Sequence, residues 1–232
     1  MEKGVQILEE WASRISFDPA EVDRERKVII EEWRLGRGAD ARMFDRQVPV
    51  LFQGSRYAER QPIGKVEVIE KADAAALRGF YWKWYRPESM AVVAVGDFDP
   101  ARMQELIRAR FSGLKDPDGA AAVRPEYPVP DHAATLYAPA SDPEATASRV
   151  SVYTQHEVRL VRSEADYRRE LLEGLYNGML NARLDELSKK PDNPFTRAYS
   201  YSYRSLRTKQ AYVLTARVRE GRIPQTLQAL LA

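Results

Sequence analysis

A stretch rich in proline, aspartate, glycine and alanine divides the chain near its middle. It reads KDPDGAAAVRPEYPVP, from Lys115 to Pro130. This composition is typical of a linker, because proline and glycine interrupt both helix and strand patterns. Helical periodicity and short β-branched runs occur on each side of it. The sequence therefore predicts an α+β fold with two consecutive domains, residues 1–115 and 132–232, joined by a linker over residues 116–131.

The first domain is expected to contain several helices and one apolar strand. Asp18 is a good N-cap and Pro19 occupies the first helical position, so a helix is predicted that runs to about Gly36. Periodic apolar residues predict further helices over residues 1–14, near 42–46, over 72–84 and over 100–112. One apolar run, residues 90–95 in MAVVAVGDFD, is typical of a buried strand, and we expect it to be the central strand of this domain's sheet.

The second domain reads as strands around one long helix. Strands are expected near residues 134–138 and over 148–156, and a long helix spans about 164–189. Residues 197–205 and 210–219 alternate in polarity and predict a hairpin. Each domain is expected to be a sandwich of an antiparallel-rich sheet with helices on one face. Both ends of the chain fall within helical patterns, so we expect the first domain to be truncated at its N-terminus and the second at its C-terminus.

The overall composition excludes several classes of function. The net charge is +2, from 36 basic and 34 acidic residues, which gives no electrostatic case for nucleic acid as a partner. No apolar run approaches the roughly 18 residues that cross a bilayer, so no membrane span is expected. Cysteine is absent, which excludes disulfides and thiolate zinc sites. The lack of cysteine is compatible with either the periplasm or the cytoplasm.

Two glutamates are the candidate site residues. In RERKVIIEEWR, residues 24–34, Glu25 and Glu32 stand seven positions apart, close to two helical turns, so they share one face of the predicted helix. Glu31 lies about 100° around the helix from Glu32 and breaks this interval. A solvent-exposed helix with Glu32 paired to Arg34 or a nearby lysine explains the pattern without a function. A helix that carries a metal ligand also explains it, although spacing alone favours the solvent-exposed helix, and the residues leave both interpretations open.

Four segments occur together in one order over residues 1–115: FDPAEVDRERKVIIEEWR, YAERQPIG, LRGFYWKWYRPESM and VVAVGDFDP. In this combination the chain resembles the insulinase/pitrilysin family of zinc metallopeptidases, the inverzincins, and is most similar to the long bacterial zinc proteases of that family. The segment ADYRRELLEGLYNGMLNARLDEL is similar to the domain that follows in such proteins.

The resemblance implies a zinc-dependent endopeptidase that hydrolyses peptides or small unfolded proteins through zinc-activated water. In the family, an H-x-x-E-H helix supplies two histidine ligands and the glutamate that activates water. A downstream acid in the pattern E-R-x-V-x-x-x-E supplies the third ligand. Carried over by position, Glu32 is that zinc ligand and Glu25 is an accessory carboxylate near the metal. The resemblance also implies that the helix turns both acids inward.

The chain departs from the family in one decisive respect. It has two histidines, His132 and His156, and neither lies in an H-x-x-E-H. The family's spacing would place that motif upstream of Met1. We therefore expect zinc in the intact parent protein, and neither bound zinc nor activity in this chain alone. The expected partners are a peptide substrate and the remainder of the parent, or a second copy of the chain.

An alternative interpretation is a non-catalytic homologue that acts as a partner subunit or scaffold. Of the two cellular locations, the resemblance slightly favours the periplasm. Substrate-binding residues are not assigned. The aromatic cluster Phe80–Tyr85 has the spacing of a helix core. The alternating strand YSYSYRS, residues 199–205, has an edge that could accept an extended peptide.

Overall fold

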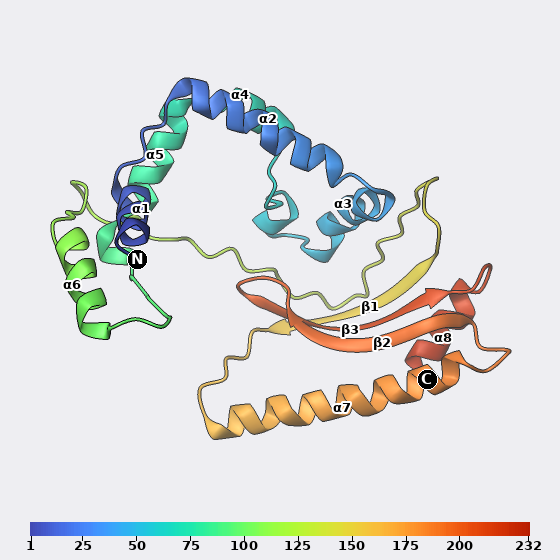
Figure 1. Cartoon of the computed structure of the whole chain (residues 1–232). Coiled ribbons are helices and arrows are strands. Elements are labelled where there is room, and N and C mark those ends of the chain that lie inside the picture. Colours follow the sequence, from blue (N-terminus) through green and yellow to red (C-terminus); the bar gives the residue numbers. More distant parts are fainter. The chain divides into compact units, whose positions relative to one another are not determined.

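A computed structural model describes all 232 residues, and the chain divides into two compact units (Figure 1). Unit 1 consists of residues 1–36 and 61–125, and unit 2 consists of residues 37–60 and 126–232. Residues 37–60 thus pack with the C-terminal half, although a boundary at residue 115 would assign them to the first domain. No helix combines the length and the apolar character that crossing a bilayer requires.

Unit 1 is built from helices whose ends follow local sequence signals. Asp18 accepts a hydrogen bond from the backbone N–H of Ala20 at 2.8 Å and caps the second helix, as its sequence predicts. Asp73 and Asp99 cap two later helices in the same way. The α-helices of this unit are α1 (Glu2–Ser13), α2 (Pro19–Leu35), α4 (Val66–Lys71), α5 (Ala74–Trp84) and α6 (Pro100–Phe111), and a short 3-10 turn, η2, spans Pro87–Ser89.

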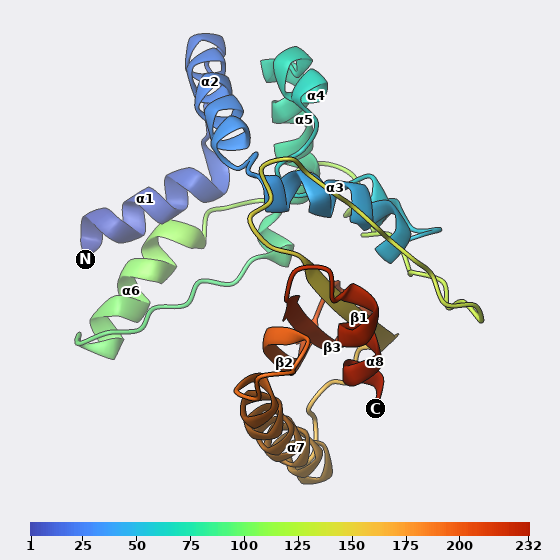
Figure 2. The same ribbon diagram turned by 90° about the vertical axis from the view of Figure 1, so that its right-hand side faces the viewer.

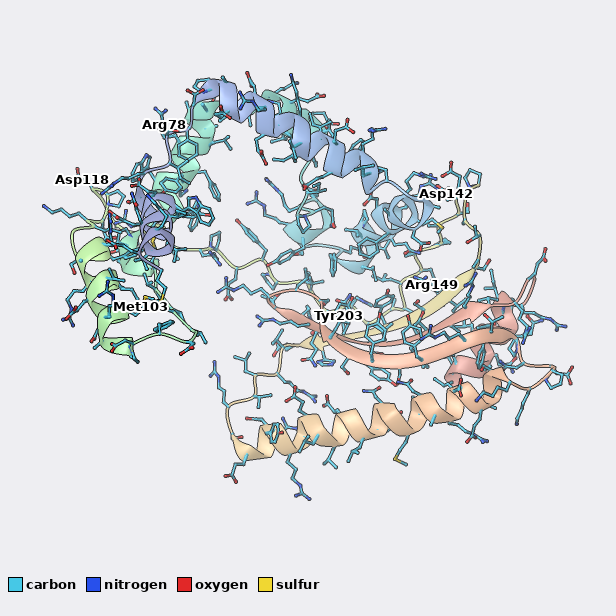
Figure 3. The ribbon with its side chains drawn as sticks, in the orientation of Figure 1. Arg78, Met103, Asp118, Asp142, Arg149 and Tyr203 are labelled. Atoms are coloured by element: carbon cyan, nitrogen blue, oxygen red, sulfur yellow. The ribbon has the colours of Figure 1, made fainter.

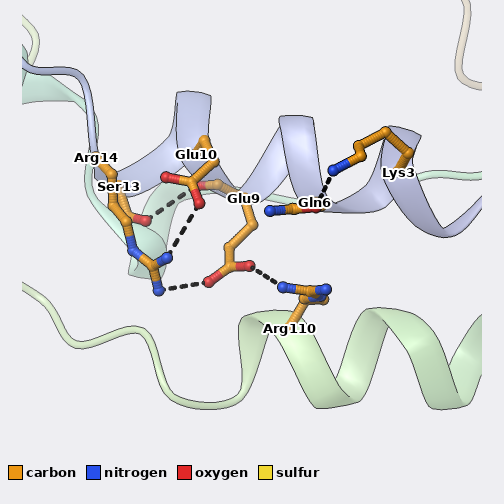
Figure 4. Close-up of polar contacts among 7 residues, drawn as sticks. All are labelled: Lys3, Gln6, Glu9, Glu10, Ser13, Arg14 and Arg110. Atoms are coloured by element: carbon orange, nitrogen blue, oxygen red, sulfur yellow. Dashed lines mark hydrogen bonds and ion pairs between the residues drawn. The ribbon is translucent and has the colours of Figure 1, made fainter.

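A buried carboxylate joins two of these helices. Glu9 on α1 is only 4% exposed, and its carboxylate lies 2.7 Å from the guanidinium of Arg14 and 3.5 Å from that of Arg110 on α6 (Figure 4). Tyr81 on α5 donates its hydroxyl to the carbonyl of Trp11 at 2.9 Å. These contacts, rather than a large apolar core, hold α1, α5 and α6 together.

The predicted central strand at residues 90–95 does not form. The segment has no regular structure, and Val93 and Val95 are 78% and 92% exposed. A strand needs a neighbour to pair its backbone groups, and unit 1 contains no other strand. The prediction of a sheet in the first domain is therefore wrong, and two consecutive sandwich domains are not shown.

Unit 2 contains the only sheet, which gives the chain its α+β character. Its strands are β1 (Arg149–Glu157), β2 (Phe195–Arg204) and β3 (Lys209–Val218), all antiparallel in the order β1-β3-β2. The predicted hairpin is confirmed as β2 and β3. The expected strand at 134–138 is wrong, because those residues form a loop; the carbonyl of Ala138 accepts a hydrogen bond from the side chain of Gln47 at 3.1 Å.

Two helices cover one face of this sheet (Figure 2). The long helix α7 (Glu164–Ser188) packs on β2, and α8 (Ile223–Leu231) packs on β1 and β3. Ser163 and Asp166 form a reciprocal capping box at the start of α7. The core between the layers contains Leu184, Phe195, Ala198, Ala216 and Leu230, all buried.

Residues 37–60 attach to unit 2 by a smaller core and by polar contacts. This segment contains α3 (Ala39–Leu51) and the 3-10 turn η1 (Arg56–Ala58). Val48 and Phe52 pack against Val129. Arg42 pairs with the buried carboxylate of Asp142 at 2.7 Å, which ties α3 to the loop before β1.

Candidate functional site

Helix α2 carries both candidate glutamates, and polar contacts hold it on α4. The guanidinium of Arg26 donates to the backbone carbonyl of Ile69 and, at 2.6 Å, to that of Ala72. Arg26 belongs to a half-buried stripe with Val22, Ile29 and Trp33. Because these residues are spaced four, three and four apart, they form the face of α2 that is turned toward the rest of unit 1.

The glutamates do not lie on that half-buried face. Glu25 and Glu32 are both exposed, and α2 buries no residue completely. At about 100° per residue, they fall beside the half-buried stripe, on a side that also carries the 49% exposed Val28. The expectation that the helix turns its acids inward is therefore wrong in this structure. The ligand role itself remains a prediction.

Arg34 forms its ion pair with Glu31 and not with Glu32. Arg34 donates its Nε and Nη2 to the carboxylate of Glu31, at 2.9 and 2.7 Å. This hydrogen bond raises the pKa of the Arg34 guanidinium. The carboxylates of Glu32 and Glu25 have no hydrogen bond or ion pair within the chain. The interpretation of Glu32 as the partner of Arg34 is thus wrong, since Arg34 pairs with Glu31.

The chain's own residues do not make a zinc site. No three of its histidine, aspartate and glutamate side chains are grouped so that they could hold a metal ion. Both histidines belong to unit 2, where the Nδ1 of His132 lies 2.7 Å from the carbonyl of Ala134 and that of His156 lies 3.1 Å from the carbonyl of Glu157. A protein zinc site takes three or four protein ligands. Glu32 offers one.

The edge of β2 is not fully free to accept a peptide. The N–H of Ser200 donates to Asn181 Oδ1 at 2.6 Å, and Asn181 Nδ2 donates to the carbonyl of Ser200 at 3.0 Å. Ser200 Oγ also donates to Asn177 Oδ1 at 2.6 Å. Both asparagines lie on α7, so the helix occupies the backbone groups at the middle of this edge strand. Sequence reasoning missed this contact, because nothing in the sequence pairs residue 181 with residue 200.

The aromatic cluster on α5 is only partly a core. Tyr81 is 3% exposed and stacks on Tyr85 at a ring distance of 4.7 Å. Phe80, Trp82 and Tyr85 are all more than a third exposed. The core interpretation is confirmed for Tyr81 and wrong for these three.

Comparison with known proteins decides the family. Residues 71–221 match the family model described as the Peptidase M16 inactive domain, which is more than half of the chain. The chain belongs to the M16 (insulinase) peptidase family. A zinc protease PQQL-like protein of Arabidopsis thaliana is 36% identical over 196 residues, which cover 84% of this chain and 20% of that protein. A probable zinc protease PqqL of Haemophilus influenzae is 28% identical over 201 residues, covering 87% of this chain and 22% of that protein.

Solved structures show the same fold for the M16 chain. The first half of the periplasmic protease PqqL from Escherichia coli superposes with a TM-score of 0.82 at 24% identity, over 99% of this chain and 49% of that one. The ferredoxin protease FusC, in complex with Arabidopsis ferredoxin, superposes with a TM-score of 0.83 at 25% identity. The match covers 99% of this chain and 25% of that one. The chain spans about a fifth of the length of the curated relatives it matches. The predicted family is confirmed, and Glu25 and Glu32 lie before the residues that match the inactive domain.

Proposed function

We propose that this chain is part of a zinc-dependent metalloendopeptidase that hydrolyses peptides or small unfolded proteins. In this proposal α2 contributes Glu32 as the third zinc ligand and Glu25 as an accessory carboxylate. Support comes from membership of the M16 family and from relatives described as zinc proteases. Two histidines and a water-activating glutamate would come from an H-x-x-E-H segment outside these residues.

The observation that carries the proposal is that the carboxylate of Glu32 is exposed and uncommitted. A metal ligand must be ionised and free of a competing partner. Arg34 binds the neighbouring Glu31 instead, which leaves the carboxylate of Glu32 without a competing ion pair. Glu25 is also exposed, but a rise of about 1.5 Å per residue places it about 10 Å from Glu32 along the helix axis. That separation suits an accessory carboxylate better than a second ligand of the same ion.

This chain by itself is proposed to be inactive, because it supplies one ligand where a catalytic zinc site uses three. The substrate class is inferred from relatives: the solved FusC structure is a protease in complex with a protein, ferredoxin. A periplasmic location is proposed because the matching PqqL structure is described as periplasmic. The remainder of the parent protein, or a second copy, would complete the enzyme.

The experiment compares two adjacent glutamates in a protein that joins this chain to an H-x-x-E-H segment. Glu32→Gln should lower both the zinc content and the chelator-sensitive cleavage of an unfolded protein, because a neutral amide is a poorer zinc ligand. Glu31→Gln is the matched control and should leave both near wild type, since it removes only an exposed ion pair. Equal effects of the two substitutions would overturn the assignment of Glu32.

A second candidate function is a non-catalytic family member that acts as a partner subunit or scaffold. The match of residues 71–221 to the inactive type of M16 domain favours it. The coding sequence upstream of Met1 separates the two functions. An intact H-x-x-E-H there supports the peptidase, whereas an altered motif supports the scaffold.

A further inference from the structure

Three arginines lie side by side at one end of the sheet in unit 2. Arg149 on β1 is directly opposite Arg217 on β3, and Arg217 is directly opposite Arg197 on β2. All three are exposed. Opposed residues project to the same face of a sheet, so the three guanidinium groups share one face. We call Arg149, Arg197 and Arg217 the arginine row.

The same face carries a series of tyrosines next to the arginine row. The rings of Tyr199, Tyr201 and Tyr203 follow one another along β2 at 5.7 and 5.6 Å. Tyr153 on β1 shares the register position of Tyr201, with the buried Val213 between them. The four rings are between 36% and 40% exposed. We call Tyr153, Tyr199, Tyr201 and Tyr203 the tyrosine face.

The arginine row and the tyrosine face are contiguous. Arg197 lies over the ring of Tyr199, with its Cζ 5.5 Å from the ring centroid. Burial raises the pKa of Tyr153, and the nearby charge of Arg149 partly offsets that rise. Helices α7 and α8 cover the opposite face, on which Val150, Ala198 and Ala216 pack. Figure 3 labels Arg149 on β1 and Tyr203 on β2, which stand at opposite ends of this face.

The arginine row has little negative charge to balance it within the chain. The carboxylate of Asp40 reaches Arg149 at 4.0 Å, and both of these side chains are mostly exposed. Arg197 and Arg217 have no ion pair. Like charges directly opposite each other on neighbouring strands are destabilising. A negatively charged ligand could therefore accept hydrogen bonds from all three guanidinium groups. Its charge would also reduce the repulsion between them.

We propose that this face of the sheet binds an extended acidic peptide segment, whose carboxylates pair with the arginine row while its apolar or aromatic side chains lie on the tyrosine face. Strands about 4.8 Å apart give the arginine row a width of roughly 10 Å, which exceeds a single small anion. The tyrosines extend along β2, so the charged and aromatic contacts together fit an extended peptide better than a small ligand. Guanidinium groups favour carboxylates because two parallel hydrogen bonds can form. This binding requires neither zinc nor Glu32.

The test uses the 232-residue chain and fluorescence anisotropy with two short fluorescein-labelled peptides. One peptide alternates glutamate with tyrosine and serine, and the other has glutamine in place of each glutamate. The chain should bind the glutamate peptide at least about tenfold more tightly, and added salt should weaken that binding. Equal binding of the two peptides would overturn the proposal.

Two sets of substitutions test whether binding depends on the arginine row itself or only on the net charge of the chain. Replacing Arg149, Arg197 and Arg217 by glutamine should weaken binding of the glutamate peptide by about tenfold or more. The matched control replaces three exposed arginines of α7 by glutamine and should bind as wild type; they are Arg168, Arg169 and Arg183. An equal loss in both variants would contradict the proposal.

Two further results keep the test decisive if the triple variant folds poorly by circular dichroism. Arg217→Gln alone should weaken the binding of the glutamate peptide a few-fold and leave the binding of the glutamine peptide unchanged. Tyr201→Ala should weaken the binding of both peptides, whereas Tyr201→Phe should keep it, because the ring makes the contact. Binding of an oligothymidylate of matching charge as tightly as the glutamate peptide would assign the face to nucleic acid and overturn the peptide proposal.

Discussion

Removing the side-chain amide of Asn181 should destabilise unit 2 more than any other single polar change on α7. Asn181 is the only contact that satisfies both backbone groups of Ser200 on the free edge of β2. Asn181→Ala deletes both hydrogen bonds. Each is worth about 1 kcal/mol net, with a further cost where water cannot reach the orphaned group, so we expect a loss of about 2–3 kcal/mol in the free energy of unfolding.

Two matched variants test whether the loss of stability comes from the hydrogen bonds between Asn181 and the backbone of Ser200. Asn181→Asp keeps the acceptor for the Ser200 N–H but loses the donor to its carbonyl, so its loss should be intermediate. Asn177→Ala removes the partner of Ser200 Oγ, but that hydroxyl also lies 3.2 Å from Asn181 Oδ1, so its loss should be about 0.5–1 kcal/mol. Both alanine variants gain the same small helix propensity, which cancels in the comparison.

Urea denaturation followed by far-UV circular dichroism measures these differences. The four tryptophans all belong to unit 1, so their fluorescence serves as an internal control and should report an unchanged transition. If Asn181→Ala and Asn177→Ala agreed within about 0.5 kcal/mol, the closure of the β2 edge by Asn181 would be refuted.

Two other predictions concern charge and exposed apolar surface. The hydrogen bond from Arg42 holds the pKa of Asp142 at about 2. Because the folded pKa is depressed, the stabilisation is complete above the unfolded value of about 3.9 and is lost as the pH falls through the folded value. An NMR titration of Asp142 checks the pKa, and a normal pKa would contradict the pairing. Exposed apolar residues such as Val93 and Val95 should make the chain self-associate at tens of micromolar in sedimentation experiments, and Val93→Glu with Val95→Glu should reduce it. A clean wild-type monomer would refute this.

Local signals in the sequence predicted most of the longer helices, although α4 was missed and α3 extends beyond the expected residues 42–46. Asp18 and Pro19 fix the start of α2 through contacts within one turn, and Ser163 does the same for α7. Such contacts depend on neighbours along the chain, so the sequence contains the information directly. The hairpin of β2 and β3 was predictable for the same reason, because its two strands adjoin in sequence.

Contacts between distant residues were not predictable. The apolar run at residues 90–95 has the composition of a buried strand, but strand formation needs a partner that unit 1 does not contain. The arginine row arises from the register of three strands, which no single segment specifies.

The helical placement of Glu25 and Glu32 was predictable from the sequence, and the environment of their side chains was not. The seven-residue interval correctly places Glu25 and Glu32 on one side of a helix. Their exposure depends on what packs against α2, and the choice of Arg34 between Glu31 and Glu32 depends on side-chain rotamers. Neither can be derived from spacing.

The measurement that tests the central claim most directly is zinc-edge anomalous diffraction. It requires crystals of a protein that joins this chain to an H-x-x-E-H segment. The account predicts an anomalous peak about 2.0–2.2 Å from a carboxylate oxygen of Glu32, with Glu25 outside the ligand set. A zinc peak with Glu32 unbound, or one bound by Glu31 instead, would contradict it.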